Sequence, residues 1–362
     1  MFRKFGLAAA ALALGGILAV SGVCYAAKGF SHLSFMGGYM EKHPTTVMVF
    51  KPFIKASEEK FGGKLSFDYF STNSLYPEAE SFSALTDGRV DIGEVRPSLF
   101  PGKMNYLGVV AIPGMCPNAI VGSLVTEELI QKFPAIAAEF PKNTVHFTSW
   151  ASAAYQLHTL KPVKTLEDIK GKKIIVWDAT TLEFIKALGA NPIRMSSPDT
   201  YLALSKGMAD GVLCPTAPLK SYKITESAKY HLMFNLAVNT FSLETNKDLY
   251  TSMPADMQNW LNQEGGLKMA LACGQSLEEG QKNDIKWMLD QGHTFYFPTD
   301  EERAALLAPL AGFVDKWQNE ECRNMDKNIT AEVLKFARER AAYHVEKLKA
   351  GEYGDYAISV QK

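Results

Sequence analysis

The sequence contains little of what marks a metal site or a disulfide-rich protein. Its 362 residues include five cysteines and seven histidines. No two cysteines form a C-x-x-C pair, and none of the four that follow Cys24 lies near a histidine at zinc-finger spacing. These absences exclude the common signatures of structural zinc, so we expect neither a metal nor a cofactor.

The motifs of the common catalytic sites are also missing. The chain has no H-E-x-x-H, no G-x-S-x-G, no phosphate-binding P-loop and no G-x-G-x-x-G. A nucleophilic cysteine needs a positioned histidine. Cys214 and His158 could meet in space, but nothing in their spacing requires it, and a histidine beside a strand is more often structural. The sequence therefore predicts a protein that is not an enzyme.

The chain also lacks an excess of charge. It has 38 basic and 39 acidic residues, for a net charge of −1 at neutral pH. Proteins that bind nucleic acid or an anionic membrane need a basic surplus or a basic patch, so this balance argues against both classes. With 47% apolar residues the chain can bury a substantial core, and its length suggests two lobes.

Long apolar runs occur only at the N-terminus. Arg3 and Lys4 precede the uncharged stretch 5–23, and Cys24-Tyr25-Ala26 then places small residues at the positions that a signal peptidase requires. We expect cleavage after Ala26 and localisation in the periplasm. An uncleaved anchor and a lipoprotein are the alternatives, and Val23 is too large for the residue that precedes a lipidated cysteine.

The first unit reads as alternating strands and helices. Leu65, Phe67 and Tyr69 alternate with polar residues, which is typical of a half-buried strand. Strands are expected at 31–36, 64–70 and 90–92, and helices at 45–61 and 77–87. This order indicates a largely parallel α/β sheet.

A second α/β unit follows a linker rich in proline and glycine. The segment 165–168 (Thr-Leu-Glu-Asp) has the form of a capping box. Strands are expected at 145–150, 172–176 and 211–214, and helices from 165, at 181–188 and at 198–206. Beyond Pro254 the pattern is helical, with an interruption at Gly265-Gly266, a capped start at Thr299 and a last helix over 330–350.

Six short segments between residues 40 and 250 carry a resemblance to a known family. They are His43-Pro44, 88–92 (GRVDI), 100–102 (FPG), 161–171 (KPVKTLEDIKG), 187–192 (ALGANP) and 209–211 (ADG). Each is weak alone, but in this order they resemble the extracytoplasmic receptor of tripartite ATP-independent periplasmic (TRAP) transporters. A binding protein of an ATP-driven importer and a secreted enzyme on a two-lobed fold are the alternatives.

The resemblance implies a two-lobed α/β periplasmic binding protein fold with hinge-crossing strands and a long helix that spans both lobes. Lobe I would comprise 27–151 with 240–278, and lobe II 152–239 with 279–362. A small organic solute, either an acid, a zwitterion or an aromatic acid, would bind in the cleft and close the hinge. A monomer would then deliver it to the small and large membrane subunits of the transporter.

The sequence departs from the family where the family holds a carboxylate. The usual arginine in the strand after Lys-Gly-x-Lys-Ile is Ile175, and a second common cleft arginine is Tyr155. The usual asparagine before proline is Cys214. The resemblance therefore places these three residues in the cleft without the arginine pair that binds an anion bidentately.

Other residues could supply the missing contacts. Arg96 stands where relatives present a ligand-facing residue from lobe I, although it could instead lie in a surface loop or pair with Glu94. Asp178 matches another cleft position, with a helix cap as its alternative. Core or hinge packing is the alternative for Trp177 and Tyr155, and a helix cap for Ser197. Glu78 and Tyr39 are further candidates.

Four cysteines would remain after cleavage, and they could form no disulfide, one or two. Their spacing does not choose among the pairings. If one disulfide exists, we expect it to join Cys273 and Cys322, because a bridge between Cys116 and Cys214 could restrain the hinge.

Overall fold

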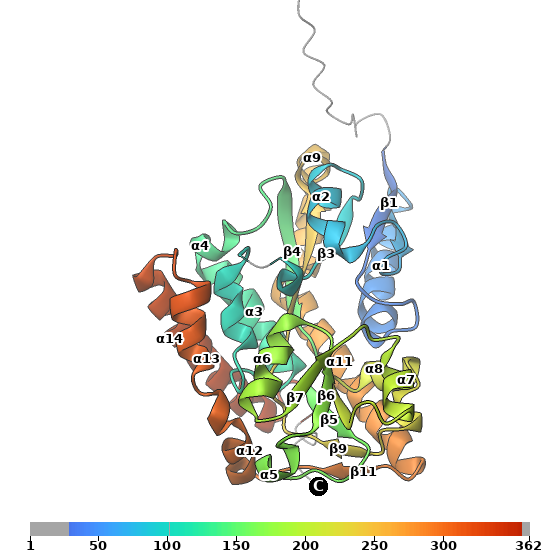
Figure 1. Cartoon of the computed structure of the whole chain (residues 1–362). Helices are drawn as coiled ribbons and strands as arrows, with labels where there is room; N and C mark the ends of the chain where they lie inside the picture. Colours follow the sequence, from blue (N-terminus) through green and yellow to red (C-terminus); the bar gives the residue numbers. More distant parts are fainter. Residues whose placement is uncertain (1–28, 101, 357–362) are drawn as a thin grey trace, which may run out of the picture.

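The computed structural model describes residues 29–100 and 102–356. The predicted signal peptide and its cleavage site lie outside these residues. Two β-sheets form the centres of two lobes (Figure 1). No helix of the described residues is long and apolar enough to cross a membrane. The predicted two-lobed α/β class is confirmed.

Lobe I is built on a five-stranded sheet in the order β2-β1-β3-β10-β4. β1 pairs in parallel with β2 and β3, whereas β10 is antiparallel to both β3 and β4. The strands are β1 (Phe30–Met36), β2 (Leu65–Phe70), β3 (Ile92–Val95), β4 (Thr144–Ala151) and β10 (Thr240–Asn246). The three predicted strands of the first unit are present. The sheet also contains β10, which follows most of lobe II in the sequence.

The helices of lobe I include several that the sequence pattern missed. Lobe I contains a π-helical turn at 46–50, α1 (Lys51–Phe61), α2 (Ser81–Thr86), α3 (Ala119–Lys132), α4 (Pro134–Ala137), α9 (Lys247–Ser252) and α10 (Ala255–Glu264), with 3₁₀ turns at 78–80, 97–99 and 105–111. α3 lies in the region interpreted as a linker. Most of its residues are buried, so it lacks the polar stripe that reveals a surface helix.

Lobe II is built on a six-stranded sheet in the order β11-β9-β5-β8-β6-β7. Its strands are β5 (Gln156–Thr159), β6 (Lys173–Val176), β7 (Asn191–Arg194), β8 (Gly211–Cys214), β9 (Tyr230–Leu232) and β11 (Thr294–Tyr296). Its helices are α5 (Leu166–Ile169), α6 (Ala179–Ala187), α7 (Thr200–Ser205), α8 (Ala217–Ser221), α12 (Asp300–Leu307) and α13 (Phe313–Lys316), with 3₁₀ turns at 224–226 and 308–310 and a π-helical turn at 317–321. The predicted capping boxes at Thr165 and Thr299 are both present, each with the acidic residue three positions later.

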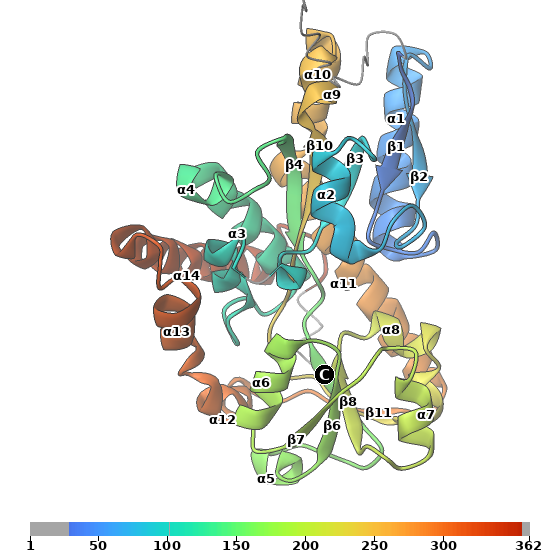
Figure 2. The same ribbon diagram turned by 45° about the horizontal axis from the view of Figure 1, so that its top comes forward.

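The long helix α11 (Gly266–Asp290) spans both lobes (Figure 2). Its 25 residues give a length of about 38 Å. It packs on α3 and β4 in lobe I and on α8 in lobe II. The predicted interruption before it is confirmed: Gly265 is extended, and a Cβ there would lie 2.4 Å from the carbonyl oxygen of Phe147.

The last helix, α14 (Lys327–Lys349), packs on lobe I. Val333, Leu334 and Ala337 share a core cluster with Ile120 and Leu124 of α3. The predicted division grouped 279–362 with lobe II, and it is wrong for this helix. The apolar face of α14 packs on α3. A sequence pattern shows that such a face exists, but it does not show which element the face packs on.

All four described cysteines are free and buried. Cys116 and Cys322 lie in the core cluster that contains α3, Cys273 in the other cluster of lobe I and Cys214 in lobe II. The conditional pairing of Cys273 with Cys322 therefore does not form. The described residues contain no group of three side chains that could hold a metal ion.

Candidate functional site

Two chain segments cross side by side between the lobes. One joins β4 to β5 and the other joins β9 to β10. Ser152 N donates to Asn239 O at 2.7 Å, Tyr155 N to Ala237 O at 2.9 Å, and Leu236 N to Tyr155 O at 3.0 Å. The segments are short and are bonded to each other, which is the arrangement of a hinge.

Arg96 follows β3 at the edge of lobe I, and each nitrogen of its guanidinium makes a hydrogen bond within that lobe. Nε donates to Glu94 at 2.9 Å, Nη1 lies 3.3 Å from a carboxylate oxygen of Glu78, and Nη2 donates to Gly38 O at 2.5 Å. Burial alone would lower the pKa of Arg96, but the carboxylates of Glu94 and Glu78 outweigh it and raise this pKa. The structure therefore shows the ion pair between Arg96 and Glu94 that was one of the alternatives for this residue.

Glu94 is the buried member of this cluster, with its side chain 3% exposed. Its second oxygen accepts from Gly38 N at 2.9 Å. Gly38 cannot be larger, because a Cβ there would lie 1.7 Å from the Glu94 carboxylate. Burial raises the pKa of Glu94 and the nearby Glu78 adds to the effect, while Arg96 opposes it.

The two other candidates of lobe I lie beside Arg96. Glu78 accepts from Thr72 Oγ1 at 2.5 Å as well as pairing with Arg96. Tyr39 is half-buried, stacks on His43 with ring centroids 3.9 Å apart, and lies under the Arg96 guanidinium at 6.0 Å. Burial, followed by the charge of Arg96, lowers the pKa of His43 to about 4, so this imidazole is neutral at neutral pH.

In lobe II, Trp177 and Asp178 lie between β6 and α6. Asp178 Oδ1 accepts from Thr181 N at 2.8 Å and caps α6. Trp177 is half-buried, and its Nε1 donates to Thr200 Oγ1 at 3.0 Å. Ser197 is half-buried ahead of α7, where its carbonyl, and not its hydroxyl, accepts from Thr200 N.

Two predicted cleft residues lie in the core of lobe II. Ile175 and Cys214 are both 0% exposed and pack in one apolar cluster with Val212 and Leu219. Neither side chain reaches the surface in this structure, and their contact with the solute stays a prediction. Their side chains lie beneath the surface on strands β6 and β8. Burial there stabilises an apolar side chain, whereas burying the charge of an arginine would cost free energy.

Tyr155 connects the two halves of the site. Its hydroxyl accepts from Asn239 Nδ2 at 2.7 Å, so the side chain ties the two crossing segments together. Burial raises the pKa of Tyr155, and the charge of Asp178 adds to this effect while that of Arg96 opposes it. Groups from both lobes therefore lie within electrostatic reach of one hydroxyl at the hinge.

A cavity of about 560 Å³ opens between the lobes next to these residues. Pro97 and Ser98, directly after Arg96, line it from lobe I, and Ala179 and Thr180 of α6 line it from lobe II. Asn239 lines it from the hinge. The cavity is therefore lined from both lobes by residues that follow Arg96 and Asp178 in the chain.

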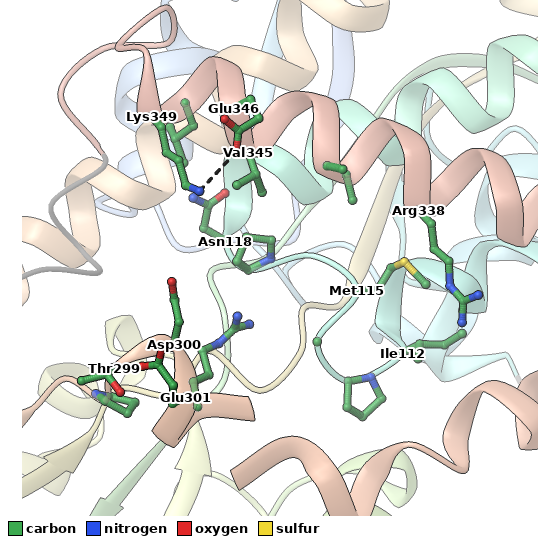
Figure 3. A pocket seen from close by; sticks show the side chains of 18 of the residues that line it. Ile112, Met115, Asn118, Thr299, Asp300, Glu301, Arg338, Val345, Glu346 and Lys349 are labelled. Carbon is green, nitrogen blue, oxygen red and sulfur yellow. Dashed lines mark hydrogen bonds and ion pairs between the residues drawn. The ribbon is translucent and has the colours of Figure 1, made fainter. Parts of the chain in front are cut away.

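A larger cavity of about 1480 Å³ lies elsewhere, between α14, the loop 112–118 and the start of α12 (Figure 3). Glu346 and Lys349 of α14, paired at 3.2 Å, face Asp300 and Glu301 across it. None of the nine predicted site residues lines either cavity, but Arg96 and Asp178 directly precede residues that line the smaller one. We therefore place the candidate site at the 560 Å³ cavity and the Arg96 cluster.

Sequence reasoning missed several residues of this site. Glu94 was considered only as a partner for Arg96, and Asn239 lies in a segment with no motif. Tyr76 and Ser81, which lie near Arg96, have no sequence signal either. Only the charge pattern Glu94-Val95-Arg96 at a strand end could have indicated the pair.

Comparison with known proteins identifies the family. The family model described as bacterial extracellular solute-binding protein, family 7, matches residues 36–321. The chain belongs to this family. The resemblance inferred from the sequence motifs is thereby confirmed.

Relatives of this family 7 protein are distant. It is 26% identical over 260 residues to the C4-dicarboxylate-binding periplasmic protein DctP of Rhodobacter capsulatus, covering 70% of this chain and 76% of that protein. It is 29% identical over 176 residues to the uncharacterized protein YiiZ of Salmonella typhimurium, covering 48% of this chain, and it spans about half (54%) of that relative's length.

The fold is similar to that of a solved TRAP solute-binding protein from Rhodoferax ferrireducens, which was crystallised with copurified benzoate. The TM-score is 0.77 at 24% identity, over 87% of this chain and 98% of that one. This likeness shows the two-lobed fold.

Proposed function

We propose that the protein is the extracytoplasmic receptor of a TRAP transporter. After export to the periplasm and removal of the signal peptide, the monomer captures a small organic solute between its lobes. The lobes close about the hinge, and the small and large membrane subunits then accept the solute. A solute favours closure only through the contacts that it makes with both lobes together.

One observation carries this proposal: residues of both lobes converge on the two bonded crossing segments. Tyr155 N donates to Ala237 O and the Tyr155 hydroxyl accepts from Asn239 Nδ2, while residues of both lobes line the cavity beside these segments. The interlobe cavity of about 560 Å³ is within the size range of small-molecule sites.

The family supports the proposal over its alternatives. Relatives named for binding C4-dicarboxylates and a structure with benzoate indicate a receptor for small organic solutes. Family 7 membership argues against a binding protein for an ATP-driven importer. It also argues against a secreted enzyme.

A thermal-shift screen followed by X-ray scattering tests this function. We expect a small organic solute, at about 100 times its dissociation constant, to raise the free energy of unfolding by about 2.7 kcal/mol. The radius of gyration should then decrease, since both lobes contact the solute. Binding confirmed by calorimetry with an unchanged radius would contradict closure. As a control, Arg194→Ala on the exposed end of β7 should bind and close like the parent.

A further inference from the structure

A third, very small cavity lies beside Arg96 in lobe I. Its volume is about 10 Å³, which is roughly the room that one water-sized group needs. Its walls include Glu78, Glu94 and Arg96, and also Tyr76 and Ser81. The side chains of Arg96 and Glu78 are 24% and 27% exposed, so the cluster is in contact with solvent.

Two hydroxyls in this wall are unpaired. Neither Tyr76 Oη nor Ser81 Oγ has a hydrogen-bond partner among the residues that the structure describes, although Tyr76 is only 5% exposed and Ser81 only 3%. Buried polar groups are nearly always paired, because an unmade hydrogen bond costs the full desolvation of the group. A polar guest in the cavity would supply the missing partner.

The charges around the cavity favour a cationic guest. The carboxylates of Glu78 and Glu94 face one guanidinium, and all three nitrogens of Arg96 already donate to oxygens of lobe I. Among the described residues that line the cavity, Arg96 is the one basic side chain. A carboxylate guest would therefore add a third negative charge beside a guanidinium that already pairs with two carboxylates.

Neighbouring basic groups do not change this balance. Arg89 lies 5.9 Å from the ring of Tyr76, but it pairs with Glu80 at 3.0 Å. Burial raises the pKa of Tyr76 and Glu94 adds to this, so the hydroxyl stays protonated. The hydroxyl can still accept a hydrogen bond, as can both carboxylates.

We propose that this cavity receives an ammonium group of the solute. The protein would then select an amine-bearing cation or zwitterion over an amine-free carboxylic acid. An ammonium is water-sized, carries three donors and no acceptor, and so matches the acceptors in the wall. This rests on the proposed function, since it assigns the solute class of the same receptor.

Two matched series of probes test the assignment by calorimetry at pH 7. One comprises 2-phenylethylamine, L-phenylalanine and 3-phenylpropanoate, and the other pentylamine, norleucine and hexanoate. We expect members with an amine to bind at least about tenfold more tightly than the acids without one, which is the effect of one hydrogen bond to a charged group.

Tyr76→Phe is the decisive variant, because it removes a hydroxyl that has no protein partner. It should weaken the amine-bearing probe about tenfold and leave the thermal midpoint unchanged. Ser149→Ala is the matched control: Ser149 Oγ is also buried and without a partner among the described residues, but it lies in β4 and does not line this cavity. The control should bind like the parent.

The outcomes separate this inference from the proposed function. If Tyr76→Phe binds the amine as tightly as the parent, the cavity holds water only and the inference is overturned. If the acids alone bind, the inference fails and the receptor function stands. If no probe of either series binds, the inference is overturned, and the receptor function is decided by the thermal-shift screen of other organic solutes.

Discussion

Three residues in lobe I, His146, Glu127 and Glu244, form an ion-pair cluster. His146 Nδ1 lies 2.8 Å from Glu244, and its Nε2 lies 2.9 Å from Glu127. The two carboxylates are 0% and 2% exposed and come from β10 and α3. The imidazolium therefore joins β4 to a neighbouring strand and to the helix that covers it.

This arrangement predicts a stability that falls at alkaline pH. Burial would lower the pKa of His146, but Glu127 and Glu244 outweigh it and raise the pKa to about 10. A raised pKa stabilises the folded state fully below about pH 6.5, and this stabilisation is lost as the pH rises toward 10. At pH 7, His146→Ala should lower the free energy of urea unfolding by about 3–5 kcal/mol, because it leaves buried charges unpaired.

The difference between parent and His146→Ala should shrink between pH 7 and pH 10. A difference that stays constant over this range would contradict the charged state assigned to His146. His32→Ala is the control, since the side chain of His32 is 79% exposed in its pair with Asp68. It should change the free energy by less than about 0.5 kcal/mol.

At the same scale, the sequence predicts which residues are present at the site but not what they contact. Arg96 is located correctly after a strand, yet its partners Glu78 and Gly38 come from other segments. Asp178 fits both a ligand contact and a helix cap, and the structure has the cap. Ile175, which the resemblance places at a cleft position, is fully buried in this structure.

Three elements of lobe II are joined by a chain of buried histidines. His158 of β5 donates from Nε2 to the carbonyl of Cys214 at 3.0 Å, so its Nδ1 must accept. His231 Nδ1 then donates to it at 2.7 Å, and His293 Nδ1 donates to His231 Nε2 at 2.8 Å. Lys229 Nζ completes the chain by donating to His293 Nε2 at 3.2 Å. One set of neutral tautomers satisfies every bond.

This chain predicts a loss of stability in acid. Burial lowers the pKa of His158 and His293 to about 4 and that of His231 to about 2, with nearby cationic groups contributing. Stability is therefore retained above about pH 6.5 and lost as the pH falls toward 4. His231→Phe should cost about 1–3 kcal/mol at pH 7, because both neighbouring imidazoles lose a partner. Below pH 6.5, the free energy of urea unfolding of this variant should fall less steeply with decreasing pH than that of the parent. An equal decrease in both proteins would contradict this.

At the scale of elements, local signals predicted most of the helices and strands. The capping boxes at Thr165 and Thr299 and the break at Gly265 are set by nearby residues, so the sequence reveals them. Among the elements that were not predicted, α3 and β10 are buried nearly throughout. Such segments lack the alternation that indicates which face is buried.

Across the whole molecule, few chain segments connect the two lobes. The two crossing segments, with α11 beside them, join the sheets, and a distant residue holds one of the segments in place. Arg303 of α12 donates from Nε to Phe234 O at 2.9 Å and from Nη2 to Asn235 O at 3.1 Å. Asn235 itself has a φ of +51°, a strained conformation that asparagine tolerates better than most residues.

The Arg303 contact predicts where motion between the lobes is controlled. Arg303→Gln removes a charged donor from two carbonyls at the hinge, and one such hydrogen bond is equivalent to about tenfold in the local opening equilibrium. Amide exchange over 235–239 should therefore accelerate about tenfold, while the exchange of β6 and β8 stays as in the parent. Arg194→Gln, on the exposed end of β7, is the matched control and should leave both regions unchanged. Faster exchange throughout lobe II would mean that Arg303 supports the lobe as a whole, and its assignment to the hinge would be wrong.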